Sequence, residues 1–280
     1  MPWTEITRRE YCRDKLRYAS DLTDGEWALI APFLPEPRRF GRPRTTDLRA
    51  VIEALLYIAS TGCQWRMLPK CFPPYSTVQR FFYRWRADGL WDQINHELVM
   101  RVRETEGRGA SPTAGVIDSQ SVKTTESGGP RGYDAGKKIK GRKRHILSDT
   151  TGLLVAAMVH EANIQDRDGA VPLLTSIRQA WPWLRHVFAD GGYAGSKLED
   201  ALAKAGRWTL EIVKRSDTAK GFELLPRRWV VERTLAWLNR NRRLAKDFEA
   251  TIESAKAWLM IASVKLMMTR RLAENDQLIG

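Results

Sequence analysis

The chain has 280 residues, a length that predicts two regions, one of them a full-sized domain, and its 43% hydrophobic and 28% charged residues are typical of a soluble globular protein. Its 46 Lys and Arg outnumber 33 Asp and Glu, and the formal net charge of +13 favours a polyanionic partner over an acidic protein or a plain metabolic enzyme. Three cysteines without a CxxC pair indicate neither a disulfide framework nor a zinc site, and no apolar run approaches membrane-spanning length. With no secretory signal either, we expect a cytoplasmic protein that contacts nucleic acid.

The first 105 residues predict an all-helical region. Thr23 and Glu26 match a capping box, which opens a short helix that ends near Pro32. Residues 47–60 carry apolar side chains at helical spacing, and Gly62 ends this second helix.

Two more helices complete this region. After two prolines, Ser76 can cap a helix with an aromatic inner face and a basic outer face formed by Arg80, Arg84 and Arg86. Another helix is expected over residues 91–104. A basic second helix fits a helix-turn-helix DNA reader, but a helical bundle that turns its arginines to water explains the pattern about equally well.

Residues 106–113 are small and polar and predict a linker to a second domain over residues 114–280. There the pattern changes to strands alternating with helices. The expected strands cover residues 114–122, 144–147, 153–159, 187–189 and 210–213, and the expected helices cover 167–181, 196–205 and a long segment from about 227. Residues 150–152 supply a hairpin turn between the second and third strands, and Ser196 with Glu199 forms a capping box that opens the second helix. This order predicts a mixed α/β sandwich.

Three acidic residues lie among apolar neighbours, where a carboxylate is costly to bury without a partner. Asp118 lies inside one expected strand, Asp190 closes another, and Glu232 lies in the long helix. If the two strands pair, the two aspartates come within ~5 Å of each other, and a glutamate from a covering helix can complete a site for Mg²⁺ or Mn²⁺. Taken singly, each aspartate is more simply a cap, and Glu232 a partner of Arg228.

Two basic segments border these acids. Residues 131–144 hold seven Lys and Arg and one Asp, and residues 227–246 hold seven and one Glu. A charge run is usually a solvated face, but acids ringed by cations describe a site that cuts or joins a nucleic-acid backbone. The expected DNA contacts here are Lys137, Lys138, Lys140, Arg142, Lys143, Arg144, His145, Tyr193, Arg228, Arg233 and Arg243, with a structural role as the alternative for His145.

Seven blocks spread over nearly the whole chain carry a resemblance to a known family. They cover residues 22–34, 41–44, 62–69, 117–123, 140–149, 189–194 and 228–241. In these blocks the chain resembles bacterial insertion-sequence transposases of the DDE type, in the insertion-sequence-five group. The resemblance implies a ribonuclease-H-like catalytic domain with a mixed sheet and flanking helices, in which Asp118, Asp190 and Glu232 hold Mg²⁺ or Mn²⁺, as two ions.

The chain departs from the family pattern around Glu232. Related transposases often carry a Tyr-x2-Arg-x3-Glu-x6-Lys signature, of which Arg228 and Glu232 match, but Leu225 and Asn239 stand at the Tyr and Lys positions. Arg228, Glu232, Asn239 and Arg243 share one stripe if a single helix continues through all of them. On that assumption, Arg243 or a neighbouring residue is expected to replace the missing Lys.

The function that the resemblance implies is DNA transposition. The helical region would bind the terminal inverted repeats of an insertion sequence, and the acidic site would cleave double-stranded DNA and join it to target DNA, with the protein acting as a homodimer or higher oligomer. Two other functions stay open: a non-catalytic DNA-binding repressor derived from a transposase, and a nuclease of the same fold that has no preference for repeat DNA.

Overall fold

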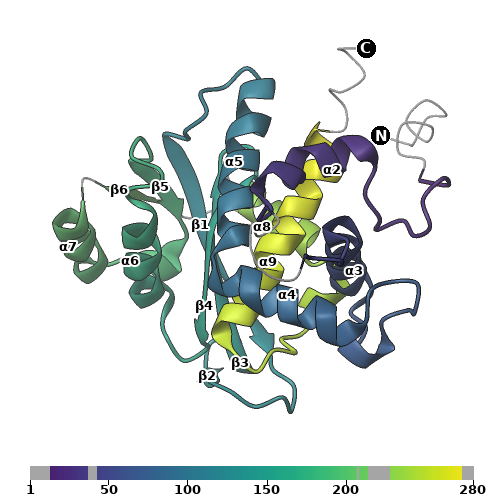
Figure 1. The fold of residues 1–280 in the computed structure, drawn as a ribbon. Coiled ribbons are helices and arrows are strands. Elements are labelled where there is room, and N and C mark those ends of the chain that lie inside the picture. Colours follow the sequence, from purple (N-terminus) through teal and green to yellow (C-terminus); the bar gives the residue numbers. More distant parts are fainter. Residues whose placement is uncertain (1–12, 37–42, 207, 214–227, 273–280) are drawn as a thin grey trace.

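The computed structural model describes residues 13–36, 43–206, 208–213 and 228–272 (Figure 1). Its helices are α2 (Asp24–Ile30), α3 (Leu48–Thr61), α4 (Tyr75–Ala87), α5 (Leu90–Thr105), α6 (Asp166–Ile177), α7 (Ser196–Ala205), α8 (Arg228–Leu238) and α9 (Ile252–Met267). Its strands are β1 (Ala114–Lys123), β2 (Gly132–Asp134), β3 (Ile139–Asp149), β4 (Leu154–Glu161), β5 (His186–Ala189) and β6 (Thr209–Ile212).

The strands form one mixed sheet. Its path is β2-β3-β1-β5-β6, and β4 pairs with β3 on the same edge as β2. β1 and β3 run antiparallel, whereas β1, β5 and β6 run parallel to one another. The predicted turn at residues 150–152 joins β3 to β4, and the expected mixed α/β architecture with a preceding helical segment is confirmed.

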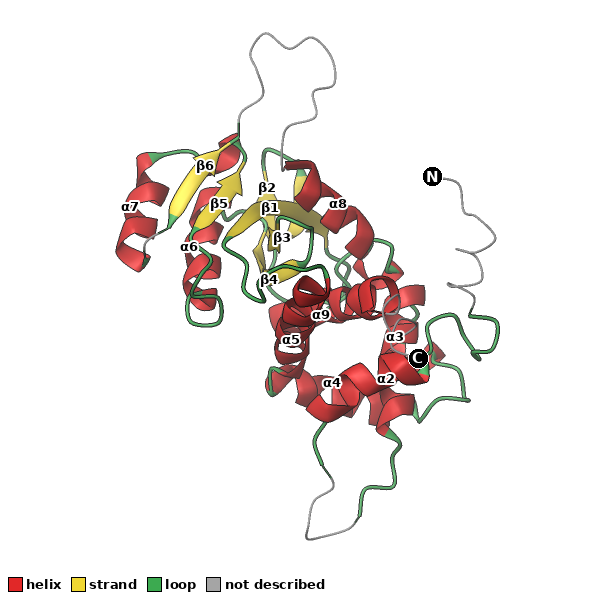
Figure 2. Ribbon diagram, turned by 90° about the horizontal axis from the view of Figure 1, so that it is seen from above, coloured by secondary structure: helices red, strands yellow, loops and turns green. Residues whose placement is uncertain are grey.

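Helices cover both faces of the sheet, as seen from above in Figure 2. α6 packs on one face, against β1, β3 and β4, and α7 packs beside α6. The other face is covered by α5, α8 and α9. This arrangement leaves the central strand β1 enclosed between two layers, with its apolar residues Val116 and Ile117 buried.

The last helix, α9, packs among the N-terminal helices. It contacts α3, α4 and α5, and the Trp258 ring of α9 stacks on Phe82 of α4 with ring centroids 4.8 Å apart. The helical layer therefore includes residues from far beyond the proposed boundary at 106–113. That segment is also tied down, since the carbonyl oxygen of Thr113 accepts hydrogen bonds from the backbone N–H groups of Arg185 and His186.

Of the three helix starts predicted from the sequence, one is confirmed and two are wrong. The capping box of Thr23 and Glu26 is present in α2. The predicted Ser76 cap is wrong, because α4 begins at Tyr75 after Pro74 at the N-cap. The expected cap at Ser196 is also wrong, because Gly195 holds the N-cap position of α7 and no side chain caps that helix.

The structure differs from two predictions in the basic segments. The strand expected at residues 144–147 begins earlier, at Ile139, so much of the basic run 131–144 lies in β2 and β3. The long helix expected from about residue 227 ends at Leu238 and is followed by the short 3-10 helix Arg242–Leu244. Arg243 therefore does not extend a helical stripe through Glu232, and it lies buried instead.

The connection between α3 and α4 spans residues 62–74. A DNA-reading helix-turn-helix joins its helices by a turn of about three or four residues. The connection here is far longer and contains the 3-10 helix Trp65–Met67. α4 nevertheless turns its basic face outward, with Arg80 and Arg84 exposed.

Candidate active site

Asp118 and Asp190 lie on neighbouring strands. β1 pairs with β5 in parallel, and the last registered pair is Val116 with Phe188. Asp118 lies two residues after Val116, and Asp190 lies two residues after Phe188, so the two carboxylates occupy equivalent positions on neighbouring segments of the sheet. Both are half-buried, because the aliphatic residues before them anchor the strands in the core.

Backbone N–H groups orient both aspartates. The N–H of Ser119 donates to Asp118 Oδ1 at 2.7 Å. The N–H of Gly192 donates to Asp190 Oδ1 at 2.8 Å, with Asp190 as the N-cap of the 3-10 helix Gly191–Tyr193. One oxygen of each carboxylate is thereby fixed relative to its own backbone.

Glu232 lies on α8, which packs against β1 and β3. Buried Val230, Val231 and Thr234 form its inner face, and the Thr234 hydroxyl donates to the carbonyl oxygen of Gly152 in the turn after β3. Glu232 itself is exposed. Among the residues that the structure describes, no three His, Cys, Asp or Glu are grouped closely enough to hold a metal ion, so Glu232 is not brought together with the two aspartates.

The two aspartates nevertheless fit a divalent metal ion by their chemistry. Carboxylate oxygens are the hard donors that Mg²⁺ and Mn²⁺ prefer. Asp118 and Asp190 supply such oxygens from equivalent positions on two paired strands.

A third aspartate, which the sequence did not single out, lies next to this pair. Asp166, the first residue of α6, accepts a hydrogen bond from Ser119 Oγ at 2.8 Å and pairs with Lys143 Nζ at 2.8 Å. Burial alone would raise the pKa of Asp166, but the hydrogen bonds from Lys143 and Ser119 hold it below its usual value. In the sequence it stands at the start of a predicted helix, where an aspartate is ordinarily a cap.

Tyr193 and His145 are buried beneath the site, so their expected DNA contacts are wrong. The Tyr193 hydroxyl lies 3.4 Å from His145 Nδ1. Burial, together with the charges of Asp166, Asp118 and Asp190, raises the pKa of Tyr193 well above its ordinary value. Burial and the neighbouring His160 lower the pKa of His145 to about 3, so its ring is neutral and structural.

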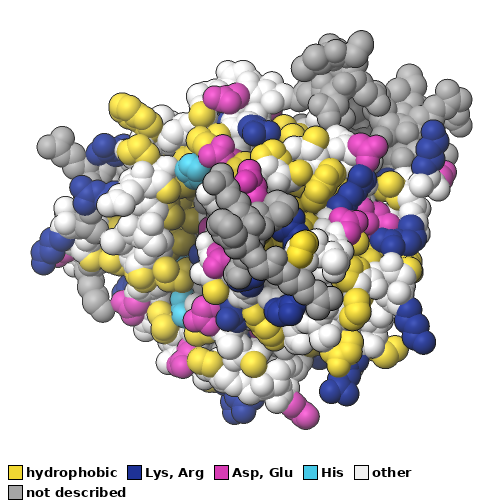
Figure 3. Space-filling model, in the orientation of Figure 1, with side chains coloured by type: hydrophobic (Ala, Val, Ile, Leu, Met, Phe, Trp, Pro, Cys, Tyr) yellow, Lys and Arg dark blue, Asp and Glu magenta, His cyan; other side chains and the backbone are white. Residues whose placement is uncertain are grey.

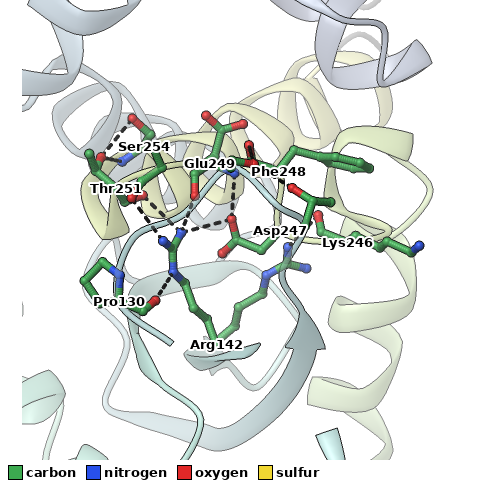
Figure 4. Close-up of polar contacts among 12 residues, drawn as sticks. Pro130, Arg142, Lys246, Asp247, Phe248, Glu249, Thr251 and Ser254 are labelled. Atoms are coloured by element: carbon green, nitrogen blue, oxygen red, sulfur yellow. Dashed lines mark hydrogen bonds and ion pairs between the residues drawn. The ribbon is translucent and has the colours of Figure 1, made fainter. Parts of the chain in front are cut away.

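Arg142 is also enclosed, and its predicted phosphate contact is wrong. Its guanidinium is 0% exposed and donates to Asp247 Oδ1 at 3.1 Å. Further bonds go to the carbonyl oxygens of Pro130, Glu249, Ala250 and Thr251 (Figure 4). The guanidinium therefore faces acceptors inside the protein rather than DNA.

The predicted DNA contacts of three more cations are wrong for the same reason. Arg144, Lys143 and Arg243 are each buried, and each binds acceptors inside the protein. Arg144 donates to the carbonyl oxygen of Leu244, and burial lowers its pKa to about 10. Lys143 binds Asp166, and Arg243 forms an ion pair with Glu249. The Arg243 side chain therefore cannot replace the missing Lys of the family signature.

Other predicted DNA contacts remain at the surface. Arg80, Arg84, Lys137, Lys138 and Lys140 are exposed. On the face shown in Figure 3, Lys and Arg side chains occur at several separate places and are interspersed with Asp and Glu.

Three predicted DNA contacts remain. Two of these side chains are held by contacts within the protein, and the third is not described. Arg86 is half-buried and donates to Thr251 Oγ1 and Ser254 Oγ, and Arg233 lies between the rings of Trp229 and Trp237. The side chain of Arg228, like Leu225, lies outside the described residues.

Two family models match the chain. The model described as the transposase DDE domain matches residues 109–267, and the model described as a putative transposase of the IS4/5 family matches residues 22–95. Within the described residues, no helix is long and apolar enough to cross a membrane. No solved structure matches the chain significantly.

Related proteins from other bacteria agree with these models. A Burkholderia cepacia protein named as a putative transposase for insertion sequence element IS402 is 32% identical over 169 residues, which cover 58% of this chain and 77% of that protein. A second B. cepacia protein, an uncharacterized 16.2 kDa protein of the same element, is 32% identical over 117 residues, covering 39% of this chain and 78% of that protein. Because the DDE domain model covers more than half of the chain, and the mixed sheet with its flanking helices is ribonuclease-H-like, the chain belongs to the DDE transposases of bacterial insertion sequences, enzymes that use a divalent metal ion.

Proposed function

We propose that the chain cleaves the ends of an insertion sequence and joins them to target DNA, with Asp118, Asp190 and Glu232 as its catalytic residues. The observation that supports this most directly is the parallel pairing of β1 with β5, which sets Asp118 and Asp190 at equivalent positions on adjacent strands. α8 carries Glu232 and packs over β1, the strand that carries Asp118.

The three carboxylates would hold Mg²⁺ or Mn²⁺, as two ions. Bound there, the metal would activate the attacking oxygen and stabilise the leaving oxygen of a phosphodiester bond. The chain itself supplies orientation: the backbone of Ser119 and Gly192 fixes the aspartates, and Thr234 and Arg233 anchor α8 to the turn after β3. Glu232 would complete the ligand set once DNA and metal are bound.

The DNA contacts that we propose are the exposed cations. Arg80 and Arg84 on α4 would bind the terminal inverted repeats, and Lys137, Lys138 and Lys140, around the start of β3, would bind backbone phosphates. Because two element ends must be brought together, we propose that the protein acts as a homodimer or higher oligomer on DNA.

Cleavage of a labelled duplex that carries the terminal repeat and its flank tests this function. We expect cuts at the repeat end with Mg²⁺ or Mn²⁺, and none with EDTA. Asp118→Asn and Glu232→Gln should each lower the cleavage rate by at least about 100-fold, because charge stabilisation of the transition state is lost. Glu199→Gln, a matched change of an exposed glutamate on α7, should cleave at the wild-type rate.

Other outcomes of the same assay would identify a different protein. Full cleavage by Asp118→Asn would remove the aspartates from the mechanism. Repeat-specific binding without cleavage under any metal would indicate a repressor. Cleavage without preference for repeat over random duplex would indicate a nuclease.

A further inference from the structure

We propose that Asp166 is a positioning residue that orients both Asp118 and Asp190 for metal binding. The inference rests on the proposed function, because it concerns the same two aspartates. Asp166 begins α6, the helix that covers the face of the sheet away from α8. From there it reaches both residues whose backbone N–H groups bind the aspartates.

The first connection runs through Ser119. Its hydroxyl donates to Asp166 Oδ1 at 2.8 Å, while its backbone N–H donates to Asp118 Oδ1 at 2.7 Å. Successive side chains of a strand point to opposite faces. Ser119 therefore transmits the position of Asp166 from one face of β1 to the carboxylate on the other.

The second connection runs through Gly192, whose N–H donates to Asp190 Oδ1 at 2.8 Å. A Cβ atom built on Gly192 would lie 3.0 Å from Asp190 Oδ1 and 3.4 Å from Asp166 Oδ2. Asp166 thus packs directly against the turn that orients Asp190. The glycine leaves just enough space for the two carboxylates to approach this turn together.

Neighbouring cations explain how Asp166 keeps its charge although it is half-buried. Lys143 Nζ lies 2.8 Å from Asp166 Oδ1, and Lys137 Nζ donates to the Ser119 hydroxyl at 3.1 Å and to its carbonyl oxygen at 2.9 Å. Since Asp166 Oδ1 already accepts from Ser119 and Lys143, Asp166 is suited to hold its neighbours rather than to bind metal.

Direct Mn²⁺ binding tests the inference without relying on catalysis. Free Mn²⁺ is measured by electron paramagnetic resonance during titration of the full-length protein. Asp166→Ala and Ser119→Ala should each weaken Mn²⁺ binding by about tenfold, a usual loss when an outer partner of a metal ligand is removed. The Mn²⁺ concentration that half-saturates cleavage should rise by the same factor.

Matched variants separate positioning from general stability. Asp168→Ala removes another acid from the first turn of α6, and Ser121→Ala removes a hydroxyl that bonds Asp134 on the same face of β1. Both should bind Mn²⁺ like the wild type. Ser119→Thr keeps the hydroxyl and should also retain wild-type affinity.

The outcomes distinguish this inference from the proposed function. If Asp118→Asn abolishes cleavage but Asp166→Ala and Ser119→Ala bind Mn²⁺ as tightly as the control variants, the positioning role is wrong and the proposed function stands. If Asp118→Asn leaves both cleavage and Mn²⁺ binding unchanged, the proposed function fails and the positioning role fails with it. Should Asp166→Ala not fold, Ser119→Ala alone decides.

Discussion

The basic residues of β3 alternate between the two faces of the strand, and their contacts differ on the two faces. Arg142 and Arg144 point toward the segment before α9, where most of their acceptors are backbone carbonyl oxygens. Lys143 and His145, which alternate with them, point toward Asp166 at the start of α6. One face holds the C-terminal segment on the sheet, and the other holds Asp166.

This difference shows why a positive segment need not be a DNA-binding surface. The four residues from Arg142 to His145 are all buried, although together they form the most basic stretch of the strand. A buried cation is costly unless its hydrogen bonds are satisfied. Each buried cation of β3 has internal acceptors, so these charges stabilise the fold and do not form a DNA-binding surface.

The largest predicted effect is a loss of stability when the contacts that hold the C-terminal segment on the sheet are removed. Arg142→Met should lower the free energy of unfolding by about 3–5 kcal/mol, because Asp247 and several carbonyl oxygens lose their buried donor. Urea unfolding measures the change. Lys140→Met, an exposed position on the same strand, should change it by less than about 0.5 kcal/mol, and equal losses in the two variants would contradict the comparison.

A smaller effect, on the opposite face, depends on pH. The pKa of His145 is lowered to about 3, so the unfolded chain takes up this proton below about pH 6.5 while the folded protein resists it. Stability contributed by the neutral ring is therefore lost as pH falls from about 6.5 toward 3.

Substitution of this histidine measures that contribution. Between pH 7 and pH 5 the wild type should lose about 1–2 kcal/mol more stability than His145→Gln, measured by urea unfolding at both pH values. His160, whose pKa burial also lowers, keeps part of the pH dependence in the variant. A pH dependence identical in the two proteins would show that folding does not shift the pKa of His145.

The smallest effect concerns the exposed cations and sharpens the contrast with buried ones. Arg80→Ala combined with Arg84→Ala should weaken DNA binding by about 1 kcal/mol at moderate salt and reduce the slope of log affinity against log salt by about two. Fluorescence anisotropy with a labelled duplex measures both quantities. An unchanged slope would mean that the outer face of α4 does not contact phosphates.

Local patterns in the sequence predicted most elements of the fold. The capping box at Thr23, the apolar stripe that ends at Gly62 and the turn at residues 150–152 depend on neighbouring residues, and each is present. The beginning of α4 and the break after Leu238 were not predicted. Both helices pack against α9, a contact between distant parts of the chain that local patterns do not contain.

The candidate site was also predicted only in part. Aspartates that directly follow aliphatic strand residues indicated Asp118 and Asp190, and the pairing of their strands is as required. Asp166 could not be found in this way, because its partners Ser119 and Gly192 come from two other segments. The burial of Arg142 and Arg144 was equally hidden, since a charge run looks the same whether it faces water or backbone carbonyls.

The placement of α9 has a consequence for the making of the protein. Its Trp258 and neighbouring apolar residues fill the space among α3, α4 and α5, so these helices lack part of their core until residue 267 has left the ribosome. The helices at the start of the chain must therefore wait for nearly the whole polypeptide before they can finish folding. A shortened product that ends before α9 would expose apolar surface and be open to proteolysis, so only a chain made through α9 would present a fully packed helical layer to DNA.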